Sequence, residues 1–147
     1  MHTNESNAIL TGDYLLALGF EFILTSSLDQ KQKLKAIEVI NNALKQASLG
    51  QNQELNCYNQ SQEDYLFIHK NKTGSVLSAA AQLGAIAANR EDLLDDAAAF
   101  GESLGIGYQI LDDIRDQDGL YNILSLQELH HLLDYYKNIS YTISRKY

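Results

Sequence analysis

None of the 147 residues of this chain is proline. Proline interrupts helices and is common in the turns that join strands. Its absence therefore favours long uninterrupted helices over a sheet with many turns. Apolar residues make up 45% of the chain, which is typical of a globular protein with a buried core. We expect residues 1–147 to form a single all-α domain, a bundle of about five long helices.

The first helix is expected over residues 8–28, where apolar residues cover most of the helical circumference. Such a helix should be buried on more than one side. Gly12 and Gly19 each cost about 1 kcal/mol relative to alanine in a helix interior. We therefore expect them to let another backbone approach closely, either within the chain or from a second chain. We find no apolar run of the length needed for a signal peptide or a membrane span.

Four further helices follow from apolar periodicity and from start signals. Ser61 and Ser125 each begin a capping box, the serine and acid pair that starts a helix. The helix that begins at Ser61 should be disturbed at Lys70–Gly74, because glycine weakens a helix. Residues 50–60 are polar and are expected to form a loop. The four helices are expected over residues 27–48, 61–88, 93–116 and 125–145.

Small residues suggest how two of these helices meet. Alanines dominate residues 76–88, and Gly101 and Gly105 fall on one face of the helix that follows. If the two helices pack against each other, these faces allow a close contact.

The charge balance limits the partners of the protein. The net charge is −8, with 19 acidic and 11 basic residues, so nucleic acid is not an expected partner. An acidic protein that binds an anionic substrate needs metal ions or a local basic patch. Cys57 is the single cysteine, which excludes an internal disulfide framework and a cysteine zinc site and fits a cytoplasmic location.

Three acids near the end of the fourth long helix are the most informative group. Asp112 and Asp116 lie one turn apart on the same helical face, with Asp113 about 100° around the axis. Like charges at this spacing repel each other, and Arg115 is expected to point elsewhere. A divalent cation such as Mg²⁺, which prefers oxygen ligands, would relieve the repulsion. The alternative is a solvated acidic helix end. An apolar run precedes the acids and places them at the edge of a core: Leu104, Ile106, Tyr108, Ile110 and Leu111.

Four short sequences occur in a fixed order along the chain. They are I-L-T-G-D-Y-L-L-A-L-G-F-E at Ile9–Glu21, G-Q-N-Q-E-L at Gly50–Leu55, K-T-G-S-V-L at Lys72–Leu77 and G-Y-Q-I-L-D-D-I-R-D at Gly107–Asp116. Together they resemble the trans-type isoprenyl diphosphate synthases, the polyprenyl synthetase family. The second sequence has Glu54 where the family pattern has aspartate.

This resemblance implies an all-α fold of the isoprenoid synthase type, with helices around a deep apolar cavity. It implies a prenyltransferase in which an allylic diphosphate ionises, with Mg²⁺ as cofactor, and isopentenyl diphosphate attacks the resulting cation. By match to the family, the metal ligands would be Asp112, Asp113 and Asp116. The catalytic and substrate-binding residues would be Lys72, Thr73 and Gln109. Gln51 would be a further substrate-binding residue.

The chain departs from the family pattern in two places. The first aspartate-rich motif should lie upstream of Ile9, where no aspartate occurs, and the lysine-bearing loop after the second motif is absent. The chain thus resembles the C-terminal half of a family member, and we expect it to need a missing half or partner for activity. In the family, the helix that corresponds to residues 8–28 packs at a two-fold interface. We expect a homodimer, or a heterodimer with a chain that carries the first motif.

Two alternatives remain from the sequence. The chain could be a non-catalytic helical partner or regulatory subunit of a full-length prenyl synthase. It could also be a structural helical protein whose motifs are coincidental.

Overall fold

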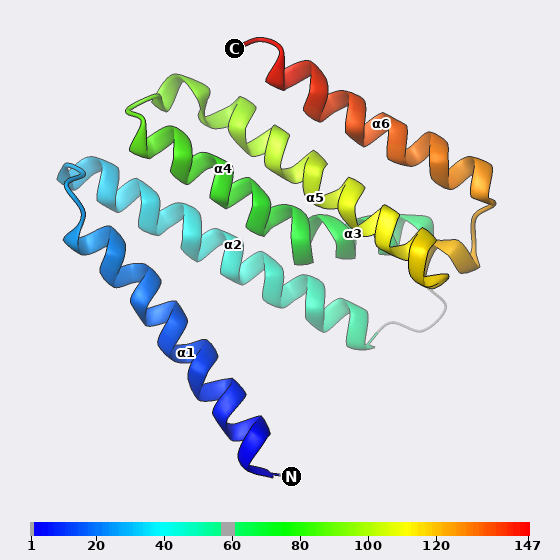
Figure 1. The fold of residues 1–147 in the computed structure, drawn as a ribbon, viewed down its shortest axis with the longest axis horizontal. Helices are drawn as coiled ribbons and strands as arrows, with labels where there is room; N and C mark the ends of the chain where they lie inside the picture. Colours follow the sequence, from blue (N-terminus) through cyan, green and yellow to red (C-terminus); the bar gives the residue numbers. More distant parts are fainter. Residues whose placement is uncertain (1, 57–60) are drawn as a thin grey trace.

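The computed structural model describes residues 2–56 and 61–147, and nearly all of them are helical (Figure 1). The α-helices are α1 His2–Thr25, α2 Gln30–Asn56, α3 Gln62–His69, α4 Ser75–Ala87, α5 Leu94–Asp116 and α6 Leu126–Ser144. A π-helix, η1 (Lys70–Gly74), joins α3 to α4 without a break, and two short 3₁₀ turns are η2 (Glu91–Leu93) and η3 (Gly119–Asn122). Because α3, η1 and α4 form one continuous helix, the described residues contain five long helices. The predicted all-α fold is confirmed.

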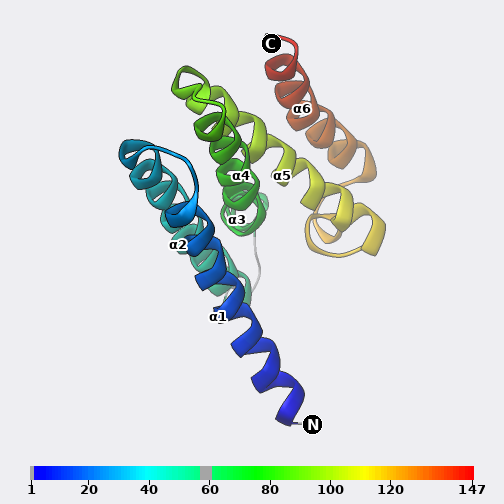
Figure 2. The same ribbon diagram turned by 60° about the vertical axis from the view of Figure 1, so that its left-hand side comes forward.

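The long helices lie side by side in one row, in the order α1, α2, α4, α5, α6 (Figures 1 and 2). Within the described residues, α1 contacts no long helix except α2, and α6 contacts none except α5. Globular domains normally bury their core between two packed layers. A single row instead leaves both of its broad faces open.

The core is divided into two clusters between neighbouring helices. One lies between α2 and α4 and the other joins α5 and α6 to η3. The buried members are Ala36, Val39, Ala79 and Ile86 in the first cluster, and Ile106, Ile110, Leu120 and Leu129 in the second.

Glycine allows α5 to lie directly against the neighbouring helix. A Cβ on Gly101 would collide with the backbone of Leu77 in α4, and a Cβ on Gly105 would lie 2.7 Å from Cα of Gly74 in η1. The predicted contact between the glycine face and the small-residue helix is therefore confirmed.

Both predicted capping boxes are present. Ser125 Oγ accepts a hydrogen bond from the Glu128 backbone N–H, and the Glu128 carboxylate accepts one from the Ser125 backbone N–H at 2.8 Å. Ser61 and Asp64 form the same arrangement at the start of α3. The hydrogen bonds from Ser125 lower the pKa of the Glu128 carboxyl. These caps fix where α3 and α6 begin.

The predicted burial of the first helix is wrong for this chain. Ile9 is 66% exposed and Leu15 is 58% exposed, and only the C-terminal end of α1, at Ile23, packs on the first core cluster. Gly12 and Gly19 have no neighbouring atom within 4 Å of an added Cβ. Figure 2 shows why, since α1 diverges from the other helices towards its N-terminal end. Many of its apolar side chains, Ile9 and Leu15 among them, are therefore exposed in the described part of the chain.

The length of the apolar segment in α1 also needs a correction. Residues Asn4–Thr25 form a helix that is long and apolar enough to cross a membrane, judged by length and composition. The sequence prediction of no such run is therefore wrong, because the acids at Glu5, Asp13 and Glu21 lie far enough apart to leave a strongly apolar average. The same test is met by core helices of soluble proteins and by signal sequences.

The polar residues after Gly50 differ from their prediction as a loop. Helix α2 continues to Asn56, and residues 57–60 of the expected loop, Cys57 among them, lie outside the described residues. The helix persists because Gly50 packs on η1, where a Cβ would lie 2.6 Å from the backbone nitrogen of Lys72. The predicted disturbance at Lys70–Gly74 is confirmed, as a π-helix rather than a break.

The close contact at Gly105 provides a test of this packing. Gly105→Ala should destabilise the protein by about 1–3 kcal/mol, because the added methyl group meets the η1 backbone rather than a flexible side chain. Gly84→Ala in α4 is the matched control. It has open space around its Cβ and should stabilise the protein by about 0.5–1 kcal/mol. Chemical denaturation measures both, and equal effects would contradict the packing.

Candidate functional site

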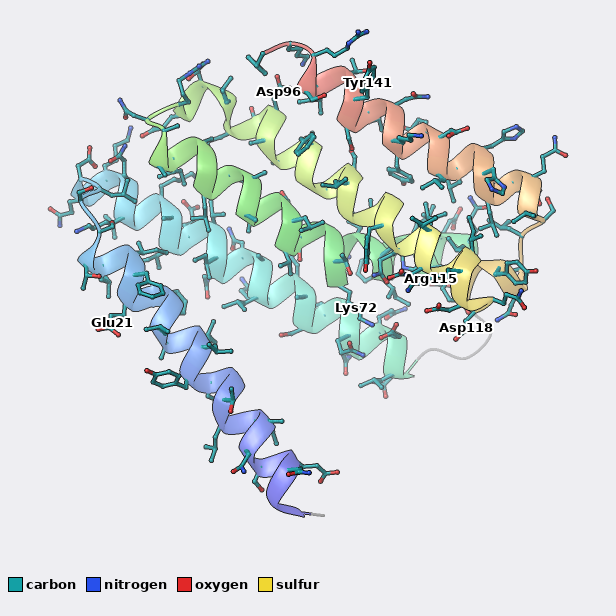
Figure 3. The ribbon with its side chains drawn as sticks, viewed as in Figure 1. Glu21, Lys72, Asp96, Arg115, Asp118 and Tyr141 are labelled. Carbon is teal, nitrogen blue, oxygen red and sulfur yellow. The ribbon has the colours of Figure 1, made fainter. Side chains whose placement is uncertain are left out.

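A cleft of about 770 Å³ lies where the C-terminal ends of α2 and α5 meet η1. In Figure 3, Lys72, Arg115 and Asp118 lie together at this end of the row, and Asp96 and Tyr141 lie at the other end. The polar side chains that line the cleft are Glu54, Tyr65, His69, Lys72, Gln109, Asp112, Asp113, Asp116 and Asp118.

The cleft brings together most of the predicted site residues. The acids Asp112, Asp113 and Asp116, together with Gln109, line it from α5, and Lys72 lines it from η1. Two predicted residues, Thr73 and Gln51, are not in the lining. Thr73 follows Lys72 in η1, and Gln51 reaches the cleft through a neighbouring acid, as described below.

The lysine is carried by a segment whose backbone is fixed on two sides. Gly50 of α2 and Gly105 of α5 each approach the η1 backbone so closely that a Cβ would lie within 2.7 Å of it. The π-helical hydrogen bond from the Ser75 backbone N–H to the Lys70 carbonyl closes the turn. Isolated π turns occur frequently at functional sites. Here the π turn presents Lys72 to the cleft from a rigid support.

An acid partner holds the lysine side chain. Lys72 Nζ donates to Glu54 Oε2 at 2.6 Å, and Gln51 Nε2 donates to the same oxygen at 2.8 Å. Both members of the ion pair are about one-third exposed or more, 34% for Lys72 and 40% for Glu54. Solvent screens such a pair, so that it contributes little to stability. The lysine is therefore oriented but still able to exchange partners.

Arg115 bridges two of the three acids. Its Nη2 lies 2.8 Å from Asp112 Oδ1, and its Nε lies 3.1 Å from Asp116 Oδ1. The prediction that Arg115 points elsewhere is therefore wrong. The long side chain reaches both carboxylates because they lie three residues before it and one residue after it. The hydrogen bond that Arg115 donates to Asp116, followed by the negative charges of Asp116 and Asp112, raises the pKa of Arg115.

Asp113 has different partners from the other two acids. His69 Nε2 lies 2.9 Å from Asp113 Oδ2, and the Leu120 backbone N–H donates to the same oxygen at 2.9 Å. The Asp113 side chain is 13% exposed and that of His69 is 5% exposed. Burial, and after it the negative charges of Asp118 and Asp113, raise the pKa of the nearby Tyr65 hydroxyl.

The fit of the site to a divalent cation differs among the acids. Within residues 2–56 and 61–147, no three Asp, Glu, His or Cys side chains converge as a metal ion requires. Asp112 and Asp116 nevertheless already share one cation, the Arg115 guanidinium. Two carboxylates that share a cation are a donor set that Mg²⁺ accepts when other oxygens complete its shell. The roles of the three acids as metal ligands stay a prediction.

Glu54 and His69 are site residues that the sequence prediction missed. From the sequence, Glu54 is only the glutamate that replaces the aspartate of a family pattern. The available signal for His69 is its position three residues before Lys72, which places the two side chains about one turn apart on the same helix.

A model of the polyprenyl synthetase family matches residues 1–124. The chain belongs to this family. Two relatives show the range of similarity. Geranylgeranyl pyrophosphate synthase 4 of Arabidopsis thaliana is 34% identical over 121 residues, which are 77% of this chain and 32% of the relative. Farnesyl diphosphate synthase of Haemophilus influenzae is 31% identical over 124 residues, 79% of this chain and 42% of the relative.

Solved structures support the same fold. A geranyltransferase from Helicobacter pylori superposes with a TM-score of 0.78 at 26% identity, over 95% of this chain and 52% of that one. An FPP/GFPP synthase from Zymomonas mobilis gives a TM-score of 0.83 at 21% identity, over 97% of this chain and 56% of that one. The fold is the all-α isoprenoid synthase type. This polyprenyl synthetase family chain spans about half the length of these structures, and less of the curated relatives.

Arg115 provides a test of the acidic site. Arg115→Gln should tighten Mn²⁺ binding by about 2–5-fold, because it removes a cation that pairs with two carboxylates through exposed ion pairs. Isothermal titration calorimetry with Mn²⁺ measures this. Arg145→Gln is the control, since it makes the same charge change at a side chain stacked over Tyr141 in α6. Unchanged or weaker binding in the Arg115 variant would show that the ion does not use these acids.

Proposed function

We propose that this chain provides the diphosphate-binding wall of an isoprenyl diphosphate synthase. The reaction is the condensation of an allylic diphosphate with isopentenyl diphosphate. The observation that carries the proposal is that Lys72, Gln109 and the aspartates of α5 line one cleft in a member of the polyprenyl synthetase family. The proposal is supported by two relatives of the chain, which are named as geranylgeranyl pyrophosphate synthase and farnesyl diphosphate synthase.

The residues of the cleft have distinct roles in this proposal. Departure of diphosphate builds negative charge, which the Lys72 ammonium stabilises from its fixed backbone. Glu54 orients Lys72 and releases it when the anionic substrate arrives. Gln109 contacts the substrate edge with its side-chain amide. Thr73 and Gln51 support the substrate from beside Lys72 and Glu54.

Magnesium is the cofactor in this proposal. Asp112 and Asp116 would hold it, and the sequence match adds Asp113. When bound, Mg²⁺ supplies charge neutralisation for the leaving diphosphate. A solved Helicobacter pylori geranyltransferase is described as complexed with magnesium and isoprenyl diphosphate.

An apolar face next to the acids would protect the reactive cation. Leu104, Tyr108 and Leu111 follow one face of α5 towards Asp112, and each is about half exposed. In a closed site, such a face excludes water from the carbocation. In the described residues it is open, so another layer of helices must cover it.

The proposal therefore includes a missing half. Residues 1–147 would be a single all-α domain that corresponds to the C-terminal half of a polyprenyl synthetase. The other half, with the first aspartate-rich motif, would come from another polypeptide in a heterodimer or from a further part of the same protein. The exposed apolar face of α1 would pair with a second chain, and a homodimer through this helix is compatible with its open glycines. We also propose a cytoplasmic location, because a single cysteine fits a reducing compartment.

The catalytic part is tested by kinetics. The chain alone should give no product, and co-expression with a polypeptide that carries the first aspartate-rich motif should give Mg²⁺-dependent incorporation of isopentenyl diphosphate. In that complex, Lys72→Gln should lower kcat by at least about 100-fold, as loss of a preorganised charge contact does. Lys70→Gln is the control, since Lys70 pairs with Glu102 and lies outside the lining. Absence of product with every partner would refute catalysis, and association without catalysis would indicate a regulatory subunit.

The binding part can be tested on the chain alone. Inorganic diphosphate with Mg²⁺ at 100 times the dissociation constant should stabilise the folded state by about 2.7 kcal/mol, which raises Tm by about 5–10 °C. Asp112→Asn should abolish the shift, because it removes a carboxylate that lines the cleft. Glu63→Gln, an exposed acid in the first turn of α3, should keep it. The same shift in Asp112→Asn as in the unmodified chain would contradict the site.

A further inference from the structure

Asp113 differs from the two acids that flank it in what it contacts. We propose that Asp113 is a positioning residue and not a magnesium ligand. With His69, it fixes the C-terminal end of α5 against the helix that carries Lys72. The part of this inference that concerns the metal rests on the proposed function, and the part that concerns positioning stands on the described contacts alone.

One oxygen of the Asp113 carboxylate already has two protein donors. Its Oδ2 atom accepts hydrogen bonds from the Leu120 backbone N–H and from His69 Nε2, both at 2.9 Å. Both side chains are largely buried, at 13% and 5% exposure. Within the described residues, Asp112 and Asp116 pair instead with the guanidinium of Arg115, whose side chain is 65% exposed, while their own side chains are 22% and 62% exposed. A ligand can displace that exposed partner much more readily than two buried donors.

The backbone folds closely around this carboxylate. Gln117, with φ of 55°, ends α5 in the left-handed conformation and donates its N–H to the Asp113 carbonyl, as does Asp118. Gly119 also has positive φ, and a Cβ there would lie 2.6 Å from Asp113 Oδ2. The chain thus reverses over Asp113 and brings Leu120 into the core, where it is fully buried. By accepting the Leu120 N–H, the Asp113 carboxylate holds this reversal of the chain in place.

His69 links the reversal to the lysine. It is the last residue of α3, immediately before η1, and Lys72 lies three residues further along the same continuous helix. Its Nδ1 atom is buried and has no hydrogen-bond partner in the structure. Among the described residues, the contact with Asp113 is therefore the polar interaction that orients the imidazole. Because an ionised carboxylate can only accept, we assign the hydrogen to Nε2. This contact therefore fixes the position of the α5 acids relative to Lys72.

A metal ion at Asp113 Oδ2 would compete with both donors. It would leave the Leu120 N–H and the His69 imidazole buried without an acceptor, and buried donors without partners are costly. The two acids on the open side, Asp112 and Asp116, carry no such cost. They are the pair that faces a cation, and Asp113 keeps them aimed at the cleft.

The positioning role is tested without metal. His69→Leu removes the donor and should lower Tm by roughly 4–8 °C and speed hydrogen exchange at the Leu120 amide by about tenfold or more. His69→Gln retains an amide N–H near the position of Nε2 and should recover at least half of the loss. His131→Leu, at an exposed histidine of α6, is the matched control. Unchanged Tm and Leu120 exchange in His69→Leu would overturn the positioning role.

The metal part is tested by Mn²⁺ binding in the presence of inorganic diphosphate, measured by electron paramagnetic resonance. Asp112→Asn and Asp116→Asn should each weaken binding at least about tenfold, and Asp113→Asn, which retains an acceptor oxygen for the Leu120 amide, less than about threefold. If Asp113→Asn weakens binding as much as Asp112→Asn while His69→Leu leaves it unchanged, Asp113 is a ligand and the inference is wrong. Parallel weakening in Asp113→Asn and His69→Leu supports positioning. If the unmodified chain binds no Mn²⁺, the proposed function fails, and the exchange experiment still decides the role of His69 and Asp113.

Discussion

Close backbone contact around the π-helix is the constraint on which the site depends. Gly50 from α2 and Gly105 from α5 touch η1 from two sides, at distances that no side chain would permit. Each glycine costs some helix stability, but the two contacts pack α2 and α5 directly on η1. Lys72 therefore projects from a backbone with little freedom, next to the acidic end of α5. The geometry of the cleft follows from helix packing and not from a flexible loop.

The charges in the cleft form two separate arrangements. In the pairs of Lys72 with Glu54 and of Arg115 with Asp112, the cation is 34% and 65% exposed, so that solvent screens each pair and the cation can exchange partners. The pair of His69 with Asp113 is buried and holds the backbone reversal after α5. The exchangeable pairs are suited to binding a ligand, because a new partner replaces an old one at small cost. The buried pair is suited to holding the exchangeable ones in place.

The sequence predicted features that depend on local chemistry. Helix content followed from the absence of proline, helix starts from the serines at Ser61 and Ser125, and the close packing of α5 from its glycines. The site was predicted in part, because residues one turn apart on a helix must share a face. The contact of His69 with Asp113 could not be predicted, because it joins positions 44 residues apart. The exposure of α1 was missed because apolar periodicity shows which face of a helix is apolar but not which partner covers that face.

The open row of helices and the composition of the cleft lead to one further step. Five carboxylates and one lysine line the cleft, so a diphosphate would meet net negative charge there. Two like unit charges about 4 Å apart repel each other by about 4 kcal/mol even at an effective dielectric constant of about 20. Binding of an anionic substrate thus requires positive charge that the lining lacks, from metal ions, from the helices that cover the open face, or from both. The apolar side chains exposed on α5, Leu104 among them, require the same covering layer. In the proposed enzyme, a second layer of helices that faces α5 across the cleft would cover these apolar side chains and, together with metal ions, would supply the positive charge.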